Sequence, residues 1–312
     1  MKAIIIGFGN IAEKGHLPTY HKLGIEIAAI VDICGKRREK ARSYGLQAYE
    51  SLEDVKEDAD VIDICAPPNY RLEAVVYAAE KGLDVICEKP ISHTSEAERI
   101  RDAVDEGGIF FFPVHNWKYA PQYQKARELI MGNGILEVQM STHRTTYNPG
   151  NPDWNPDWRV KREISGGGIL MDHGYHNIYL AMYLLGRKFR EVKLKEIEYF
   201  PDSLVEKKAR FELLFPEKVE INLDWNSTKR EIRNVIYGDK VIQLLDDSLV
   251  VDGEVQDRVG RISKDSVHME WYYSVFSDFL EKRKLGDNAC FLEGLKVLEG
   301  LGELYNQARA MA

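Results

Sequence analysis

The sequence predicts an α/β fold in two parts, a doubly wound parallel sheet followed by an α+β domain with a large, mainly antiparallel open sheet. Two observations predict it. Short apolar runs alternate with amphipathic stretches in the first part of the chain, which is typical of βαβ units. Alternating runs joined by short turns fill most of the rest, which is typical of antiparallel strands. We expect a first domain over residues 1–118 and a second over 119–312.

The elements of the first domain follow from this alternation. Strands are expected at 3–6, 27–31, 60–65, 83–87 and 109–113, and helices near 11–22, 36–44, 69–81 and 94–106. Pro67, Pro68 and Pro90 fall just beyond expected strand ends, where proline stops a strand from running on.

The second domain has a different sequence pattern. A helix over 121–132 ends at a Gly-Asn-Gly stop, a long strand follows over 135–147, and a loop rich in Pro, Asn, Asp and Trp occupies 148–159. Further helices are expected at 169–186, 268–283 and 291–309, and strands at 191–199, 207–215, 218–225, 231–237, 240–245 and 248–251. Pro216-Glu217 and Asp252-Gly253 are typical hairpin turns.

Composition narrows the class of protein. The formal net charge of −8 argues against a nucleic-acid partner, which usually meets a basic face. The apolar run at the amino terminus is too short for a signal peptide, and no segment approaches the roughly 20 apolar residues of a membrane helix. The 4 cysteines form no CxxC pair and are expected to be reduced. These observations predict a cytoplasmic protein without a membrane partner.

A dinucleotide site is expected where the first strand ends. Gly7-Phe8-Gly9-Asn10-Ile11-Ala12 is a G-x-G-x-x-A fingerprint between a strand and a helix, which is typical of a Rossmann domain that binds NAD or NADP. Gly7 permits the tight turn, and Gly9 lets the pyrophosphate approach the backbone. Asp32 ends the second strand at roughly the 20-residue spacing of the ribose-binding acid. Its carboxylate favours NAD, although Lys36, Arg37 and Arg38 nearby leave NADP open, and helix capping is the alternative role.

Two more segments reach the same edge of the sheet. Pro67 and Asn69 follow the third long strand, where Asn69 is expected to cap the next helix and the segment to flank the nicotinamide ribose. Glu88-Lys89-Pro90 follows the strand at 83–87, so Glu88 and Lys89 are expected at the coenzyme site. A lysine at the carboxyl end of a parallel strand lies where ligands bind in open α/β sheets.

Asp172 and His176 are the second pair of chemical groups. They follow Gly166-Gly167-Gly168, lie one turn apart and are expected to share a helix face. Histidine suits proton transfer because its ordinary pKa of roughly 6.5 lies near neutrality. The alternative is a hydrogen-bonded pair on a solvated face. A metal site formed with His173 is not expected, because no further ligand lies nearby in the sequence.

These motifs together resemble the glucose–fructose oxidoreductase / inositol dehydrogenase / MocA family of NAD(P)-dependent sugar oxidoreductases. The resemblance covers both domains in order and rests on GFGNIA with Asp32, CEKP at 87–90, NWKYAP at 116–121 and GGGILMDHGYH at 166–176. It implies hydride transfer between nicotinamide and a secondary hydroxyl of a sugar, cyclitol or sugar derivative. It also implies that Lys89 meets the reacting hydroxyl, that its bond to Pro90 is often cis, and that Asp172 and His176 bind substrate and move the proton.

One departure concerns His176. Many members of the family carry an Asp at the third position after this histidine, where this chain has Tyr179, so the imidazole is expected to be held differently or to meet a different substrate. Lys118 of the boundary motif and Trp154, Trp158 and Arg159 of the loop are substrate candidates, with ordinary loop packing as the alternative.

Two other functions stay open beside the dehydrogenase. Some relatives use tightly held NAD transiently to cleave glycosidic bonds, and a non-catalytic NAD- or sugar-sensing regulator would need the same scaffold. The family resemblance also implies a homodimer or homotetramer that associates through the outer face of the second sheet. A cluster of Arg159, Lys161 and Arg162 leaves room for an anionic group on the substrate, or is a solvated basic patch.

Overall fold

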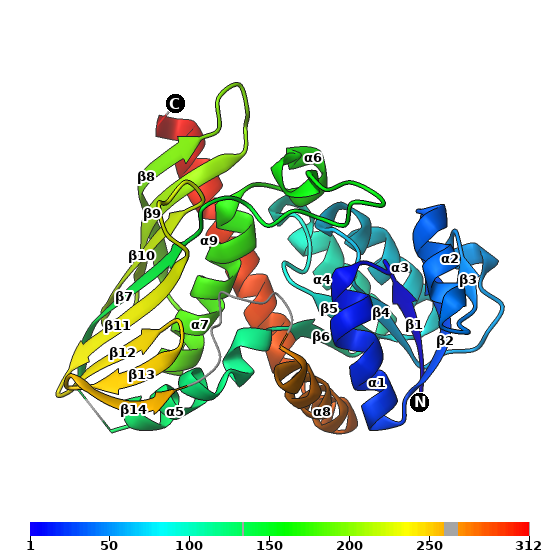
Figure 1. The fold of residues 1–312 in the computed structure, drawn as a ribbon, viewed down its shortest axis with the longest axis horizontal. Coiled ribbons are helices and arrows are strands. Elements are labelled where there is room, and N and C mark those ends of the chain that lie inside the picture. Colours follow the sequence, from blue (N-terminus) through cyan, green and yellow to red (C-terminus); the bar gives the residue numbers. More distant parts are fainter. Residues whose placement is uncertain (133, 259–267, 312) are drawn as a thin grey trace.

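Two sheets lie side by side in the computed structural model, which describes residues 1–132, 134–258 and 268–311 (Figure 1). The first sheet has the order β3-β2-β1-β4-β5-β6, and every neighbouring pair is parallel. This is the strand order of a doubly wound Rossmann domain. Its elements are β1 (Lys2–Ile6), a π-helical turn (Ala12–His16), α1 (Leu17–Leu23), β2 (Glu26–Val31), α2 (Gly35–Ser43), β3 (Ala48–Tyr49), β4 (Val61–Ile64), α3 (Arg71–Lys81), β5 (Asp84–Glu88), α4 (Ala97–Gly107) and β6 (Phe111–Val114).

Strand β1 shows why these residues form a buried sheet. Ile4 and Ile6 belong to one apolar cluster, which also contains residues of α3 and α4, and Ala3 and Ile5 belong to another. Successive side chains of a strand point to opposite faces, so both faces of the sheet are covered. The continuous apolar run at 3–6 is the sequence pattern of such a strand.

The second sheet has the order β14-β13-β12-β11-β7-β10-β9-β8, and only the pair β7–β10 is parallel. The fold class predicted from the sequence is therefore confirmed. The elements here are α5 (Pro121–Ile130), β7 (Ile135–His143), α6 (Arg162–Ser165), a second π-helical turn (Leu170–Gly174), α7 (Tyr175–Leu185), β8 (Glu191–Tyr199), β9 (Glu206–Leu214), β10 (Lys218–Asp224), β11 (Glu231–Gly238), β12 (Val241–Leu245), β13 (Ser248–Val251), β14 (Glu254–Arg258), α8 (Met269–Leu285) and α9 (Ala289–Met311). Helices α7 and α9 cover one face of the sheet, and Figure 1 shows the other face uncovered.

The predictions for individual turns and strands are confirmed only in part. Both hairpin turns are present, with Asp252 and Gly253 at φ of 50° and 86° between β13 and β14. The strand expected over 135–147 ends earlier, at His143. Two strands were not predicted: β3 has only 2 residues, and β14 is EVQDR, which has no apolar alternation.

The two parts of the chain share helices. Tyr272, Val275, Phe276 and Phe279 of α8 lie in the same apolar cluster as Ala3 of β1, so a helix from the carboxyl end of the chain covers the first sheet. Helix α9 contacts both β6 and β8. The boundary near residue 118 stays a prediction, and the two sheets are held together by apolar packing as well as by the chain crossing between them.

None of the helices in the described part of the chain combines the length and the apolar character needed to span a membrane.

Candidate active site

A cavity of about 500 Å³ lies where the two sheets meet, and residues of both domains line it. On the first domain the lining comes from the carboxyl ends of β1, β2, β4 and β5. On the second domain it comes from the segment after β7, the turn Leu170–Gly174 and the residues that follow β10. A cavity of this size at the carboxyl edge of a parallel sheet is where a cofactor and a small substrate bind.

The glycine fingerprint has the geometry that a dinucleotide requires. Gly7 has φ of +84°, and a Cβ there would lie 2.8 Å from the backbone nitrogen of Ala66, so only glycine fits. A Cβ on Gly9 would meet nothing within 4 Å, because this residue faces the open cavity. The loop thus leaves room for a pyrophosphate to approach the backbone, and the residues present fit NAD.

Asp32 is the acidic residue at the far end of this region of the cavity. Its carboxylate accepts the N–H of Phe8 at 2.7 Å and of Cys34 at 2.8 Å, and these bonds fix its direction. Burial nevertheless raises its pKa, so the group gains from further hydrogen bonds to its ionised form. Of the three basic residues expected nearby, the two arginines are already paired, Arg37 with Glu13 at 2.6 Å and Arg38 with Glu50 at 2.7 Å, and Lys36 is exposed and does not line the cavity.

Most of the residues expected to bind the coenzyme line the cavity, and two do not. Those that do are Gly7, Gly9, Asn10, Ile11, Asp32, Pro67, Glu88 and Lys89. The side chain of Phe8 instead lies fully buried in the core beside β1, and only its backbone serves the site, through Asp32. Asn69 does not line the cavity and does not cap α3: its Oδ1 is buried without a hydrogen-bond partner, and no side chain caps that helix. The short 3-10 turn Pro68–Tyr70 supplies the start of the helix instead.

Glu88 is tied into a buried polar chain below the cavity. Its Oε1 accepts from the hydroxyl of Tyr272 at 3.0 Å and lies 3.2 Å from Nε2 of His16, whose Nδ1 is 2.7 Å from Asp63. Burial alone would lower the pKa of His16, but Asp63 and its neighbours raise it well above the ordinary value. A charged His16 therefore holds two carboxylates in place. The His16, Asp63 and Cys65 donor atoms are close enough for a metal, but the direct His16–Asp63 hydrogen bond already satisfies two of them.

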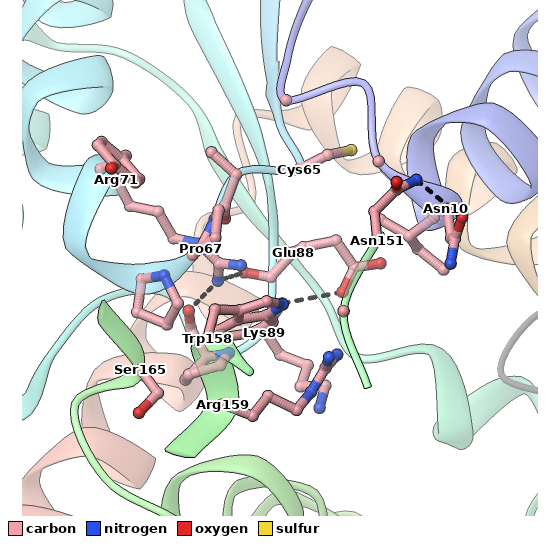
Figure 2. A pocket seen from close by; sticks show the side chains of 18 of the residues that line it. Asn10, Cys65, Pro67, Arg71, Glu88, Lys89, Asn151, Trp158, Arg159 and Ser165 are labelled. Atoms are coloured by element: carbon pink, nitrogen blue, oxygen red, sulfur yellow. Dashed lines mark hydrogen bonds between the residues drawn. The ribbon is translucent and has the colours of Figure 1, made fainter. Parts of the chain in front are cut away.

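Lys89 lies at the centre of the cavity and joins the two domains (Figure 2). Its Nζ donates to Oδ1 of Asp172 at 2.7 Å and to the carbonyl of the same residue at 3.2 Å. The peptide bond between Lys89 and Pro90 is cis, as the family resemblance implies. Burial would raise the pKa of Asp172, but Lys89, His173 and Arg159 overcome this and hold it well below its usual range. Asp172 is therefore a carboxylate at neutral pH.

The three glycines before Asp172 serve packing. A Cβ on Gly167 would overlap the hydroxyl of Tyr305, and one on Gly168 would overlap the backbone of Glu206. The buried carboxylate of Glu206 accepts the N–H of Gly168 at 2.7 Å and of Leu170 at 3.1 Å. The start of the helix is thereby pressed against β9 and α9. The π-helical turn that follows is a geometry often found at functional sites, and no sequence pattern predicted it.

His176 lines the same cavity as Asp172, but the two residues bind different partners. Nδ1 of His176 is 2.6 Å from the hydroxyl of Tyr179, and its ring stacks on Trp117 at 4.1 Å. Burial, followed by the charges of Lys89 and His173, lowers the pKa of His176 well below its usual value. The imidazole is thus neutral and fixed in plane, and its Nε2 has no hydrogen-bond partner among the described residues. Tyr179, the residue at which this chain departs from the family motif expected from the sequence, is therefore the partner of the His176 ring.

Three of the four residues expected to bind substrate line the cavity, and one does not. Trp154, Trp158 and Arg159 line the cavity, and the guanidinium of Arg159 stacks 4.2 Å from the Trp158 ring. Lys118 does not line it: its ammonium group is bound by Glu293, a residue of α9 far away in the sequence. His115 also contacts Glu293, at 3.0 Å, so this cluster lies behind the cavity wall and holds α9 in place.

The loop of residues 148–157, which we call the strap, belongs to the second domain and reaches the coenzyme side, where Figure 2 shows Asn151 beside Asn10. Asn151 donates to Asn10 of the fingerprint at 3.2 Å, and Asp153 lies 3.5 Å from Arg37. The ring of Trp154 meets that of Tyr70 at 6.4 Å. The strap therefore closes over the coenzyme half of the cavity and contacts both ends of it.

Several residues that line the second-domain half were not singled out from the sequence. They are Arg144, Trp225 and Arg230, and they lie beside His173, which was considered only as a metal ligand. His173 accepts from Nε1 of Trp225 at 3.2 Å, and burial lowers its pKa well below the usual value. The positions of these residues depend on how β7, β10 and β11 pair, which the sequence pattern did not specify.

Comparisons with known proteins agree with this geometry. Residues 1–115 match the oxidoreductase family with an NAD-binding Rossmann fold, and residues 123–242 match the GFO/IDH/MocA C-terminal domain. The chain belongs to the Gfo/Idh/MocA oxidoreductase family. The resemblance recognised in the sequence motifs is confirmed, and so is a first domain of the NAD-binding type.

Individual relatives are dehydrogenases of sugars. The chain is 32% identical to D-glucoside 3-dehydrogenase of Escherichia coli over 60% of this chain and 54% of the relative. It is 32% identical to levoglucosan dehydrogenase of Pseudarthrobacter phenanthrenivorans over 47% of this chain and 39% of the relative, so it spans about half the length of these relatives or less. A levoglucosan dehydrogenase solved with NADH and levoglucosan shares the fold with a TM-score of 0.83 at 20% identity, over 100% of this chain and 98% of that one.

Proposed function

We propose that this protein is an NAD-dependent dehydrogenase that oxidises a secondary hydroxyl of a sugar, cyclitol or sugar derivative. The observation that carries the proposal is the Lys89–Asp172 ion pair of 2.7 Å beside a neutral His176, at the junction of the coenzyme and second-domain halves of one cavity. Family membership and the sugar dehydrogenases among the relatives support it. When bound, NAD supplies the chemistry by accepting a hydride at the nicotinamide ring.

The chain's own residues handle the proton and the developing charge. His176 is neutral, and in the tautomer that donates its Nδ1–H to the hydroxyl of Tyr179 the Nε2 atom carries no proton, so Nε2 takes the proton of the reacting hydroxyl. Lys89 stabilises the negative charge that forms on the substrate oxygen, while its bond to Asp172 fixes the ammonium group. Asp172 keeps acceptor sites on its second oxygen and binds a neighbouring hydroxyl of the sugar. Stacking between Trp158 and Arg159 offers a flat surface beside a ring.

The coenzyme half favours NAD over NADP. Asp32 accepts from the ribose hydroxyls and repels a 2′-phosphate, and Glu50 and Glu53 line the same end of the cavity. Because Arg37 and Arg38 are paired with carboxylates, neither guanidinium is available to a phosphate without breaking an ion pair.

The direct test is a screen of polyols, aldoses, sugar acids and nucleotide sugars with NAD, following NADH absorbance. Net NADH formation with a free sugar supports the dehydrogenase. Cleavage of a glycoside without net NADH would identify the NAD-dependent glycosidase instead. Tight NAD binding without turnover of any compound would identify the sensing role.

We also propose a homodimer or homotetramer formed through the uncovered face of the second sheet. That face carries rows of opposite charge, including Lys208–Glu196 at 2.8 Å and Lys195–Glu212 at 2.9 Å, between buried residues of β9. Light scattering after gel filtration at low and high salt tests this, and a monomer at micromolar concentration under both conditions would contradict it.

A further inference from the structure

We infer that the second-domain half of the cavity binds an anionic substituent of the substrate, a carboxylate or a phosphate, on the paired arginines Arg144 and Arg230. This inference deepens the proposed dehydrogenase function and rests on it. It concerns which sugars the cavity accepts. The argument starts from where the two strands that carry the arginines lie.

Strand pairing places the two arginines at neighbouring backbone positions, and the charge of Arg230 acts on Arg144. His143, the last residue of β7, pairs with Glu231, the first residue of the antiparallel strand β11. Extending this register by one residue puts Arg144 opposite Arg230. Both residues line the cavity. Two like charges directly opposite each other on neighbouring strands are destabilising, so the arrangement calls for a compensating charge.

The described residues do not supply that charge. The side chain of Arg144 is buried, with 5% exposure, and its hydrogen bonds go to the carbonyl groups of His143 at 2.9 Å and Glu231 at 3.4 Å. Within ion-pairing distance, 4.0 Å, neither Arg144 nor Arg230 has a carboxylate among the residues that the structure describes. Asp246 and Asp172 act on Arg144 only from farther away.

The energetics of Arg144 point the same way. Burial, and next the charge of Arg230, lower the pKa of Arg144 to about 10. A buried cation without a counterion is costly, and a planar guanidinium binds carboxylate or phosphate oxygens with two parallel hydrogen bonds. An anion between the two arginines would offset both the burial and the mutual repulsion.

Charge is also segregated along the cavity. On the first domain the charged lining residues are four acids and two arginines: Asp32, Glu50, Glu53, Glu73, Arg37 and Arg71. Glu88 and Lys89 lie at the junction of the two halves. Among the described residues, the second domain contributes Arg144, Arg159 and Arg230 to the lining and one carboxylate, that of Asp172, which Lys89 already binds. In a chain with a net charge of −8, this local excess of positive charge selects an anionic substrate from neutral sugars.

The test compares matched sets of compounds that differ only in the anionic group. Each set holds a neutral sugar, its uronate and its 6-phosphate, in the gluco, galacto and manno series, each assayed with NAD for NADH formation. We expect the charged member of at least one set to exceed the neutral member at least about tenfold in kcat/KM. The uronate and the phosphate arms show which of the two anions the arginines take.

Variants separate a specific site from general attraction. Arg230→Gln changes an exposed residue and should fold normally, and Arg144→Gln removes the buried partner. Each should bring the ratio of kcat/KM for the charged and neutral members close to one, mainly through KM. Lys240→Gln removes an equal charge from an exposed lysine outside the cavity and should leave the ratio unchanged.

Binding is measured separately from turnover, through the fluorescence of the cavity tryptophans with NAD present. The anion site is overturned if the wild type oxidises neutral sugars as well as charged ones and Arg230→Gln leaves the ratio of the two kcat/KM values unchanged. The proposed dehydrogenase function would stand in that case. Charged sugars that bind, lose binding in Arg230→Gln and yield no NADH would overturn the dehydrogenase and leave the anion site intact.

Discussion

The ammonium group of Lys89 lies 2.7 Å from the carboxylate of Asp172, and this ion pair links the end of a Rossmann strand to the turn that opens α7. The proposed reacting groups come from both domains, so neither domain alone contains all of them. The site is thus complete only when the two sheets are packed as they are here, and the apolar contacts of α8 and α9 hold them in this relation.

Replacing Lys89 by Met should abolish most turnover. The change keeps the length of the side chain and removes the charge that stabilises the substrate oxygen, so kcat should fall by about 100-fold or more. The affinity for NADH, measured by nicotinamide fluorescence, should stay within a few-fold of the wild-type value. Lys161→Met, on the surface outside the cavity, is the matched control. Normal turnover by Lys89→Met would rule out the role assigned to this lysine.

Coenzyme preference should shift when Asp32 loses its charge. Asp32→Asn should weaken NADH binding by about tenfold or more, since it removes a charge-assisted hydrogen bond to ribose, and NADPH binding should weaken less or improve. Adding Glu50→Gln releases Arg38 from its 2.7 Å ion pair and should improve NADPH binding further. Glu26→Gln, at the other end of β2, is the control. An unchanged ratio of the two dissociation constants in the double variant would contradict this account.

The pH dependence of kcat/KM should change with the residue at position 179, which contacts the ring of His176. In the wild type the pKa of His176 is well below its usual value, so the base stays unprotonated and no loss of activity from this group is expected between pH 6 and 8. Tyr179→Asp replaces the hydroxyl that now lies 2.6 Å from Nδ1 by a carboxylate on the same side of the helix, which favours the protonated ring and raises that pKa. Activity should then fall as the pH drops through the raised value. Tyr179→Asn, without the charge, should not show this limb, and identical profiles for all three proteins would exclude His176 as the base.

Lys118→Met should affect stability more than substrate binding. Burial alone would raise the pKa of Glu293, but Lys118 and His115 lower it to about 2. This carboxylate therefore contributes stability above its unfolded pKa of roughly 4.3, and the contribution is lost as the pH falls toward 2. The variant should unfold more easily at pH 7, by about 1–3 kcal/mol, and lose less stability on acidification. Urea titrations at pH 7 and pH 3 measure this, while a large rise in KM for the sugar would return Lys118 to the substrate site.

Strap contacts should govern how long the coenzyme stays bound. Asn151→Ala removes the 3.2 Å hydrogen bond to Asn10, so NADH should dissociate faster, by up to about tenfold. Stopped-flow displacement with excess NAD measures the rate. Asn226→Ala, in an exposed turn outside the cavity, is the control. Equal dissociation rates in both variants would show that the strap does not retain the coenzyme.

Local chemistry in the sequence predicted the first domain well, because each of its long strands is a short apolar run and the fingerprint needs only consecutive residues. The helices α7 to α9 and most strands of the second sheet were also expected. What could not be predicted depends on contacts between distant residues. From the sequence alone Lys118 resembles a substrate-binding residue, but in the fold Glu293 of α9 binds its ammonium group. Arg144 was expected inside a strand, and it lines the cavity because β7 ends one residue before it. Asn69 was wrongly expected to cap α3, since a 3-10 turn after Pro67 starts that helix without a side-chain cap.

Gly167 and Gly168 carry no functional group, yet they have the least room of the positions around the site, because any side chain there would overlap Tyr305 or the backbone of Glu206. In a saturation screen for activity, both positions should be as intolerant as Lys89 itself. Positions that tolerate no substitution would then include two kinds of residue near the start of this helix. One kind contacts the substrate, and the other lets the helix pack closely against Tyr305 and Glu206. Measuring the amount of folded protein for each variant would tell the two kinds apart.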